Sequence, residues 1–574
     1  HSSWGEILQA SLPPSFILRS KMEVSLTEKG KEALEKGILS DSEKAVASIL
    51  EEKSFSSFYL KKRSRLRNFP SLLRRMEKKS LVEVERELKR LERKKTAQRA
   101  VRETQLEFGF FATENLQKAV EAIEKKIEER IFSPFFLFGS RQSREEVYFY
   151  LLKRILARGE RVLFLVPEIS LGRALIEKFR KTLGERVAIL HSELPERQRE
   201  SEWQKIRNKE ADVVVGPRSA LFSPLDNLGL IVVDEEHDDS YYQQESPSYD
   251  ARGGAWLRAK EEKVALVYGS ASPSVEGFHR AKKLGYLIPL ETEIKKRRVI
   301  LVKERGGREV VSFQLLEAIG KRLERGEQAL VFLNRRGYAS FLFCSRCSYI
   351  PKCGRCDIAL TYHKREEKLV CHYCHYSIPK MEVCPVCRSR IIGKRGKGIE
   401  RVEEELKKNF PQARITCFDT DVIKSKKEKE KILHSFRKGK IDILIGTELL
   451  AHQVDLPSVS LIGILNPEAM LALSDFRAGQ RTFQALTRMK GFLEEDSLSE
   501  IIIQTALPRH FSILQAARND YISFYNQEIK FRLLMNYPPF SHMAEVLLMG
   551  ENLRSLAQKA REFSAEVKSF GRDI

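Results

Sequence analysis

Eight of the nine cysteines in this 574-residue chain lie in one stretch, residues 344–387. They form four Cys-x-x-Cys pairs, namely Cys344/Cys347, Cys353/Cys356, Cys371/Cys374 and Cys384/Cys387. Such a turn directs two thiolates at one point, and two turns complete a tetrahedral site with metal–sulfur distances of about 2.3 Å. The spacing therefore predicts two closed four-thiolate sites, which leave no open position for a substrate.

Zinc is the metal that four thiolates favour, although iron–sulfur clusters also use them. The alternative is a disulfide framework, which requires an oxidising compartment. No stretch resembles a signal peptide, and only Cys417 lies outside the four pairs. We therefore expect a reduced protein with two structural Zn²⁺ ions and a free Cys417.

The composition indicates a globular protein with a polyanionic partner. The chain is long enough for about four domains. It contains 42% hydrophobic residues, but no apolar run reaches the ~18 residues needed to cross a membrane. The net charge of +22 favours nucleic acid as the partner, although a surface rich in ion pairs gives a similar composition. The chain begins at His1 without methionine, and we expect further residues at either end in the natural protein.

The first hundred residues predict a small helical unit. Residues 1–38 are interpreted as the remnant of a linker, and residues 39–105 as a winged-helix DNA-binding domain. Ser40 and Glu43 have capping-box spacing, and residues 81–85 alternate like a strand. One helix places its basic residues on one face, which is either a DNA-binding face or ordinary solvated surface: Arg74, Arg75, Lys78 and Lys79.

From about residue 106, short apolar strands alternate with helices, which is typical of a parallel α/β sheet. Two lobes are predicted, lobe 1 over residues 106–295 and lobe 2 over 296–343 and 396–510, with the zinc-binding insertion at 344–395. Residues 511–574 are interpreted as the start of a C-terminal domain. The candidate strands are 135–138, 162–166, 187–190, 213–215, 230–233 and 265–268, then 330–333, 414–417, 441–445, 461–465 and 501–504.

One strand ends in Asp234-Glu235-Glu236-His237. At the carboxyl end of a strand, Asp234 is suited to hold the water shell of Mg²⁺, and Glu235 to orient water for attack on a γ-phosphate. The run Gly269–Pro273 follows the next strand, where it would couple the nucleotide site to DNA. Arg218 and its backbone neighbours also follow a strand and are candidates for binding nucleic-acid phosphates.

The order of these motifs resembles the PriA family of bacterial primosomal replication-restart helicases. The matching stretches are LVPEISL (165–171), ILHSEL (189–194), VVVGPRSALFSPLDNLGLIVVDEEHDDSYYQQE (213–245), FLNRRGY (332–338), the four cysteine pairs, ILIGTELLA (443–451), DFRAGQR (475–481) and NYPPF (536–540). The similarity covers nearly the whole chain, but we expect no counterpart here of the family's N-terminal domain, which holds a DNA 3′ end.

This resemblance implies two RecA-like helicase lobes, a two-zinc insertion, a winged helix and a C-terminal domain. It implies that Cys344, Cys347, Cys384 and Cys387 share one zinc and the other four cysteines the second. It also implies Mg-ATP as a cofactor and forked or single-stranded DNA as a ligand. The implied protein partners are primosome proteins, the replicative helicase or its loader, and single-stranded-DNA-binding protein.

The nucleotide-binding loop departs from the family. A P-loop requires G-x-x-x-x-G-K-[ST], in which amides, lysine and hydroxyl all hold phosphate or Mg²⁺. Here the stretch after Gly139 reads Ser-Arg-Gln-Ser-Arg-Glu-Glu. Without a gap, Glu145 replaces the lysine; with a one-residue deletion, Arg144 replaces the lysine and Glu145 the hydroxyl. In both alignments a carboxylate stands beside the triphosphate, so Mg-ATP binding through Gly139 and Arg144 is expected to be weakened or lost.

The lobe 2 stretch that supplies arginines to the γ-phosphate in the family also differs from the family pattern. The family has a QxxGRxGR stretch, whereas residues 484–492 read Gln-Ala-Leu-Thr-Arg-Met-Lys-Gly-Phe. Arg488 and Lys490 are cations, but neither is in register. Arginine fingers supply on the order of 10³–10⁵ in rate, so their loss predicts a severe defect.

The resemblance therefore implies a cytoplasmic, nucleoid-associated bacterial protein that binds abandoned or stalled forks and helps the primosome to reload the replicative helicase. Asp234 and Glu235 are interpreted as vestigial, with ATPase and helicase activity weakened or lost. The alternative is an active ATP-dependent 3′–5′ DNA helicase with an unusual P-loop. A third interpretation is a zinc protein with another duty, such as RNA handling.

Overall fold

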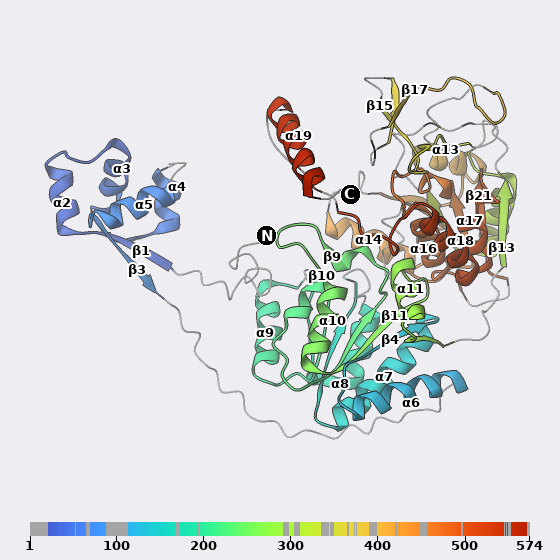
Figure 1. The fold of residues 1–574 in the computed structure, drawn as a ribbon, viewed down its shortest axis with the longest axis horizontal. Coiled ribbons are helices and arrows are strands. Elements are labelled where there is room, and N and C mark those ends of the chain that lie inside the picture. Colours follow the sequence, from blue (N-terminus) through green and yellow to red (C-terminus); the bar gives the residue numbers. More distant parts are fainter. Residues whose placement is uncertain are drawn as a thin grey trace.

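The computed structural model describes most of the chain in two α/β lobes and two smaller units (Figure 1). The described residues are 21–51, 53–64, 69–87, 113–167, 173–191, 194–290, 298–303, 310–333, 342, 344, 349–363, 367–371, 374, 376–389, 399–419, 423, 425–447, 456–494, 498–544, 546, 548 and 553–570.

The N-terminal unit packs helices against a three-stranded antiparallel sheet of order β2-β1-β3. Its elements are β1 (Lys21–Leu26), α2 (Glu28–Glu35), α3 (Asp41–Leu50), β2 (Phe55–Ser56), α4 (Ser57–Ser64), α5 (Phe69–Lys78) and β3 (Val82–Glu87). The capping box at Ser40 and Glu43 is present, and β3 covers the predicted strand. Val24 of β1 lies opposite Val84 of β3, so residues interpreted as a linker remnant belong to this sheet. Its assignment as a winged helix stays a prediction.

Lobe 1 is built on a seven-stranded parallel sheet of order β12-β4-β11-β8-β5-β7-β6. All seven residues of β8 are buried, which explains why the strand is apolar up to Asp234 and does not alternate. The strands are β4 (Ser133–Phe138), β5 (Arg161–Leu165), β6 (Val187–Ile189), β7 (Val213–Gly216), β8 (Leu228–Asp234), β11 (Ala265–Ser270) and β12 (Leu287–Pro289). The helices are α6 (Glu114–Glu128), α7 (Arg141–Ala157), α8 (Arg173–Leu183), α9 (Glu196–Arg207), α10 (Ala251–Glu262) and α11 (Val275–Lys283).

Short elements complete lobe 1. They are the 3-10 turns η2 (Gly184–Arg186), η3 (Arg218–Phe222) and η4 (Asp239–Tyr241), and the hairpin of β9 (Tyr242–Gln243) and β10 (Tyr249–Asp250).

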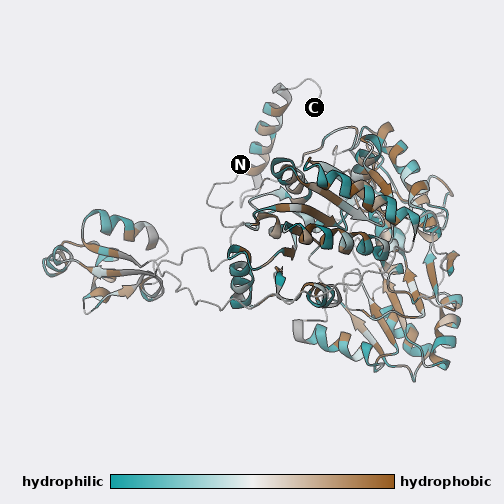
Figure 2. Cartoon of the chain, turned by 90° about the horizontal axis from the view of Figure 1, so that it is seen from below, coloured by the Kyte–Doolittle hydropathy of each residue, from teal (hydrophilic) through white to brown (hydrophobic). Residues whose placement is uncertain are grey.

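Lobe 2 has a six-stranded parallel sheet of order β13-β21-β20-β14-β19-β18. The strands are β13 (Arg298–Lys303), β14 (Ala329–Leu333), β18 (Ile415–Phe418), β19 (Ile443–Gly446), β20 (Leu461–Leu465) and β21 (Glu500–Thr505). The remaining elements are α12 (Phe313–Glu324), α13 (Ile399–Asn409), α14 (Lys426–Arg437), η5 (Pro467–Ala469) and α16 (Ala478–Lys490). In both lobes hydrophobic residues gather on the strands, while the outward faces of the helices are hydrophilic (Figure 2).

All the candidate strands of the two lobes are present, and the α/β fold class is confirmed. The sequence pattern missed β12 and β13, which are edge strands that pair on one side only. An edge strand is less buried than a central one, and its residues therefore carry a weaker apolar signal.

Helices α17 (Phe511–Arg518) and α18 (Tyr521–Leu534) pack on lobe 2, although the sequence pattern assigned residues 511–574 to a separate domain. Phe524 of α18 stacks on Phe483 of α16 with ring centroids 4.4 Å apart, and both side chains are buried. The last helix, α19 (Leu553–Phe570), stands away from the lobes in Figure 1. Within the part of the chain that the structure describes, no helix combines the length and apolar character that crossing a bilayer requires.

Candidate nucleotide cleft and metal centre

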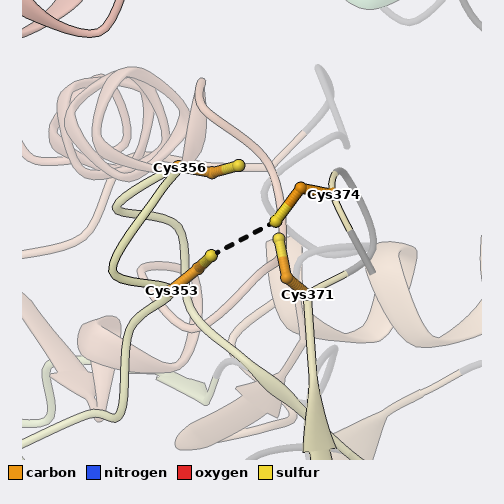
Figure 3. Close-up of side chains that lie close together, drawn as sticks. All are labelled: Cys353, Cys356, Cys371 and Cys374. Carbon is orange, nitrogen blue, oxygen red and sulfur yellow. Dashed lines mark hydrogen bonds between the residues drawn. The ribbon is translucent and has the colours of Figure 1, made fainter. Parts of the chain in front are cut away.

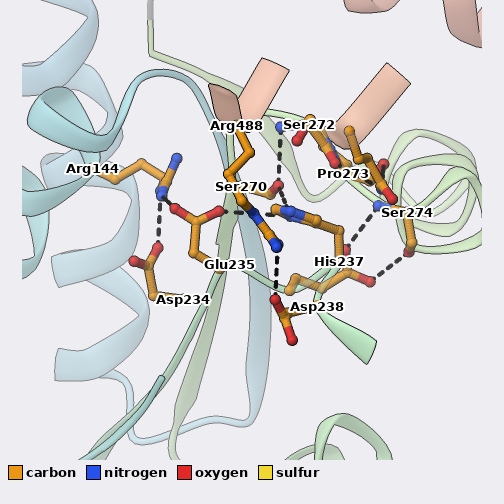
Figure 4. A network of polar contacts seen from close by, with 12 residues as sticks. Arg144, Asp234, Glu235, His237, Asp238, Ser270, Ser272, Pro273, Ser274 and Arg488 are labelled. Atoms are coloured by element: carbon orange, nitrogen blue, oxygen red, sulfur yellow. Dashed lines mark hydrogen bonds and ion pairs between the residues drawn. The ribbon is translucent and has the colours of Figure 1, made fainter. Parts of the chain in front are cut away.

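The predicted catalytic acids lie at the carboxyl edge of the lobe 1 sheet. Strand β11 lies between β4 and β8, with Ser270 opposite Phe138 and Gly269 opposite Asp234. Because the strands are parallel, the turn after β4 and the residues after β8 and β11 meet at this edge. The geometry brings the degenerate loop, the acids and Gly269–Pro273 into one site (Figure 4).

Arg144 fills this site from α7. Its side chain is fully buried. Nε donates to Asp234 Oδ1 at 2.9 Å, Nη2 donates to Glu235 Oε1 at 2.5 Å, and Nη1 donates to the carbonyl of Gly139 at 2.8 Å. Burial alone would lower the pKa of Arg144, but the charges of Asp234 and Glu235 raise it well above its usual value, so the guanidinium stays charged. One internal cation therefore pairs with both predicted catalytic acids.

Two tyrosines that the sequence analysis missed also hold Asp234. Tyr148 donates its hydroxyl to Asp234 Oδ1 at 2.8 Å, and Tyr241 donates to the Asp234 carbonyl at 2.6 Å. Burial, together with the charge of Asp234, raises the pKa of each phenol well above its usual value, so both remain donors. The spacing of Arg144 and Tyr148, one helical turn apart on α7, was the available signal.

Gly269 is required by the same packing. A Cβ atom at this position would lie 1.7 Å from the Tyr148 hydroxyl and 3.0 Å from Arg144 Cδ. Since real Cβ atoms do not approach that closely, any side chain here would displace Tyr148 from Asp234.

The turn from β4 to α7 is too short for a phosphate cradle. Strand β4 ends at Phe138 and α7 begins at Arg141, so only Gly139 and Ser140 connect them. Ser140 caps the helix with its own hydroxyl, which accepts from the Ser143 amide at 3.2 Å. A helix N-terminus binds anions through such free amides, and here one of them already has a partner within the chain.

The structure corrects the expected position of Glu145. The sequence analysis placed this carboxylate beside the triphosphate and opposite Asp234 and Glu235. Glu145 instead pairs with Arg141 at 2.8 Å and with Lys178 at 2.5 Å. Because successive residues of a helix point about 100° apart, Arg144 and Glu145 cannot face the same site. The alignment in which Arg144 replaces the P-loop lysine is therefore the one that fits the structure.

The motif after β11 is tied to the acids in two places. His237 Nδ1 and Ser270 Oγ are 2.8 Å apart, and Ser274 donates its hydroxyl to Glu236 Oε1 at 2.6 Å. Burial and the nearby charge of Arg488 lower the pKa of His237 to about 3, which keeps its ring neutral. These contacts join residues 236 and 237 to Ser270 and Ser274, and the predicted coupling of this motif to DNA stays a prediction.

Lobe 2 reaches the same edge through α16. Arg488 donates from Nη2 to Asp238 Oδ2 at 2.8 Å, one residue beyond the Asp-Glu-Glu-His run. Gln484 donates from Nε2 to the carbonyls of Ser272 and Pro273 at 3.0 and 3.2 Å. Arg488 thus crosses to lobe 1 as an arginine finger would, but an aspartate holds it.

Arg218 contributes to the internal structure of lobe 1. Its Nη1 donates to the carbonyls of Ser240 and Tyr242 at 3.0 and 3.3 Å, and the side chain is only partly exposed. It therefore anchors the segment that follows the acids, and its predicted role on DNA stays a prediction.

The basic face of the N-terminal unit is exposed, as expected. Arg74, Arg75, Lys78 and Lys79 all lie on the solvent side of α5 or just after it. Arg75 and Lys79, however, pair with the buried carboxylate of Glu43 at 3.7 and 2.8 Å. The hydrogen bond from Lys79 lowers the pKa of Glu43 to about 2, so this carboxylate remains charged. Two of the four candidate cations are thus partly neutralised.

The insertion places one cysteine group in a tetrahedral cluster. The sulfur atoms of Cys353, Cys356, Cys371 and Cys374 all lie within 4.8 Å of one another and converge on a common centre (Figure 3). Cys353 and Cys374 Sγ are 3.5 Å apart, close to the ~3.8 Å edge of a tetrahedron with 2.3 Å zinc–sulfur bonds. That separation is far longer than a disulfide bond of about 2.05 Å. The four thiolates fit zinc.

The second group is described in part. The sulfur atoms of Cys344, Cys384 and Cys387 also lie within 4.8 Å of one another, and Cys347 lies outside the described residues. No described cysteine forms a disulfide. The grouping implied by the family resemblance is therefore confirmed for the seven described members of the two sets.

A small sheet and a docking contact hold the metal centre in place. The sheet consists of β15 (Thr361–His363), β16 (Lys368–Val370) and β17 (Ser377–Pro379). Tyr537 donates its hydroxyl to the Cys356 carbonyl at 2.7 Å, and Ser474 donates to the Ala359 carbonyl at 2.9 Å. The zinc-binding insertion is therefore packed against lobe 2 and the residues after α18.

Comparison with protein families identifies the class of protein. Residues 147–278 match the DEAD/DEAH box helicase family, and residues 389–486 match the helicase conserved C-terminal domain. The two lobes are therefore RecA-like helicase domains. Residues 353–379 match the PriA DNA helicase Cys-rich region (CRR) domain.

Curated relatives narrow the class to one family. Replication restart protein PriA of Bacillus subtilis (strain 168) is 39% identical over 468 residues, which cover 80% of this chain and 58% of the relative. The PriA protein of Borreliella burgdorferi is 34% identical and covers 80% of this chain and 69% of its own length. That of Rickettsia conorii is 35% identical, with coverages of 75% and 68%. The chain belongs to the PriA family of replication restart proteins, and it spans about three fifths to two thirds of the length of these relatives.

Solved structures show similarity at low sequence identity. RecG bound to three-way DNA junction has a TM-score of 0.42 at 15% identity, with 79% of this chain and 50% of that chain covered. The DUF1998 helicase MrfA bound to DNA and AMPPNP has a TM-score of 0.40 at 14% identity, with coverages of 72% and 50%.

Proposed function

We propose that this protein binds abandoned or stalled DNA replication forks and helps to assemble the primosome, with ATP hydrolysis weakened or lost. It acts in the bacterial cytoplasm on the nucleoid. Primosome proteins, the replicative helicase or its loader, and single-stranded-DNA-binding protein are its partners. Membership of the PriA family and the net charge of +22 support the DNA-binding part.

The position of Arg144 carries the proposal on ATP. Asp234 would need to accept the water shell of Mg²⁺, and Glu235 would need a free carboxylate for the attacking water. Both carboxylates already pair with one buried guanidinium. Mg-ATP would have to displace the Arg144 side chain, which is fully buried. It would also have to bind at a turn in which only two residues connect β4 to α7.

The active helicase remains the alternative because several contacts of the cleft are in place. His237 still pairs with Ser270, and Arg488 lies across the lobe boundary beside Asp238. A guanidinium can also pair bidentately with phosphate. Rotation of Arg144 toward a bound nucleotide would give this outcome.

Measurement of DNA-stimulated ATP hydrolysis separates the two functions. With saturating forked DNA and Mg-ATP, we expect turnover at the background rate in wild type and in Glu235→Gln alike, because Glu235 already pairs with Arg144. Fork affinity measured in the same samples serves as the control for active protein. ATP turnover that Glu235→Gln abolishes would reinstate the helicase.

Fork binding through the N-terminal unit gives a second prediction. Arg74 and Lys78 have no ion-pair partner among the described residues, so they are the cations most available to phosphate. Replacing both with alanine should weaken binding to forks of any DNA sequence. The salt slope, which is the slope of log affinity against log salt concentration, should fall in magnitude by about 2, since each phosphate contact releases about one counterion. Salt titrations of fork affinity by fluorescence anisotropy would measure both effects.

Glu43→Gln is the matched opposite variant. It removes the carboxylate that pairs with Arg75 and Lys79 and keeps the side-chain volume. Fork affinity should therefore rise and the salt slope steepen. Unchanged affinity and unchanged salt slope in both variants would show that this face does not bind DNA. Equal affinity for forked DNA and for RNA would favour the third interpretation, a zinc protein with another duty such as RNA handling.

A further inference from the structure

Helix α11 belongs to lobe 1 by sequence but lies in the hydrophobic core of lobe 2. Val275 and Phe278 of α11 are buried in one cluster with residues of α16, α17 and α18. Phe278 makes edge contacts with Tyr521 at 5.0 Å and Tyr525 at 4.8 Å between ring centroids. Phe138, at the end of β4, contacts the same Tyr521 at 5.4 Å. The boundary between the lobes is therefore a shared core at this point.

A partly buried ion-pair network borders this core. Glu276 of α11 accepts from Arg477 Nε at 2.9 Å and pairs with Arg532 of α18 at 3.1 Å. Arg532 is fully buried and pairs with Glu528 at 3.0 Å. Burial would raise the pKa of Glu276, but the charges of Arg532 and Arg477 lower it, so the carboxylate stays ionised. The buried charge is Arg532, and removing one of its carboxylate partners is costly. One of those partners, Glu276, comes from lobe 1.

Gln480 joins the core to the network. Its Oε1 accepts from the Val275 amide at 3.1 Å and from Arg532 Nη2 at 2.8 Å. The Tyr521 hydroxyl donates to the Pro273 carbonyl at 3.1 Å. Opening the lobes would leave these buried donors and acceptors without partners and expose Phe278 at the same time.

We propose that α11 is a latch that holds the two lobes in one closed arrangement in the absence of nucleotide. The latch consists of Val275, Glu276 and Phe278 on lobe 1 and of Arg477, Gln480 and Arg532 on lobe 2 and α18. An ATP-driven motor requires lobe arrangements that differ by only a few kcal/mol, so that the nucleotide can shift between them. The inference is independent of ATP turnover, since it concerns the nucleotide-free protein.

The distance between the lobes tests the latch. Nitroxide-bearing unnatural amino acids at the exposed positions Lys260 on α10 and Lys321 on α12 would report it without using cysteine chemistry. In the nucleotide-free full chain we expect a single narrow distance distribution. In Glu276→Gln combined with Phe278→Ala, the distribution should broaden and shift to longer distance. A broad or bimodal distribution in the wild type would overturn the proposal.

Hydrogen exchange supplies a control for folding. The double variant should speed amide exchange in both α11 and α16–α18 by tenfold or more, although its substitutions lie only in α11. Phe179→Ala is the matched control, because Phe179 is a buried lobe 1 phenylalanine whose ring contacts, to Phe149 and Phe164, stay within lobe 1. It should speed exchange near α8 and β5 and leave α16–α18 unchanged. Faster exchange in α11 alone, with an unaltered lobe distance, would refute the latch.

Discussion

Replacing Cys371 with serine is expected to release one of two zinc ions and to unfold the insertion, while both lobes remain folded. Structural zinc contributes about 10–16 kcal/mol in small zinc modules, and few other interactions can replace it here. The cluster that surrounds the cysteines is small, and several of its buried members are themselves the predicted zinc ligands: Cys344, Cys353, Cys371 and Cys384. Elemental analysis should give about two zinc per chain in wild type and about one in the variant.

Amide hydrogen exchange would show whether the loss of structure is confined to the zinc-binding insertion. Amides of β15–β17 should lose protection in Cys371→Ser, whereas those of β8 and β20 should not. Cys417→Ser is the matched control, because Cys417 lies on β18 with Glu403 as its partner and should leave two zinc in place. Retention of both ions in Cys371→Ser, or an iron content in place of zinc, would contradict the assignment.

Replacing Arg144 with methionine is expected to destabilise lobe 1 by about 3–5 kcal/mol, the usual result of removing one partner from a buried ion pair. The substitution keeps an apolar stem but leaves Asp234 and Glu235 without their shared cation. Opening free energies from exchange of the β4 and β8 amides are the suitable measure, because a multidomain chain does not unfold in two states.

A triple variant separates charge from packing. Adding Asp234→Asn and Glu235→Gln to Arg144→Met removes the uncompensated charges, so most of the lost stability should return. Unchanged protection in Arg144→Met would show that Arg144 does not hold these acids in solution, and the proposal on ATP would lose its main support.

The metal ligands could be predicted because their signal is local. A Cys-x-x-Cys turn fixes two sulfur atoms within four residues, and its geometry depends little on the rest of the fold. The central strands could be predicted equally well, since β8 is buried on both faces and is therefore apolar up to Asp234. The basic residues of α5 could also be placed on one exposed face, because a helix has a fixed period.

The electrostatics of the site depended on residues that are distant in sequence. Arg144 meets Asp234 and Glu235 across about 90 positions, and Glu43 meets Lys79 across 36. Reading the loop as a linear motif identified its departure from the P-loop pattern, and the loss of nucleotide binding stays a prediction. The same reading placed Glu145 at the acids, because a motif alignment does not say which way each side chain of a helix points.

The sequence by itself determined the cysteine sites, the α/β class and the family, since each rests on short-range spacing or on the order of motifs. Only the tertiary structure decided that an internal guanidinium fills the nucleotide cleft and that α11 and α18 share one core across the lobes. These features arise where parallel strands and long connections bring distant residues together. The stability of a buried charge then depends on which oppositely charged side chains pack beside it, and a local sequence pattern does not specify those partners.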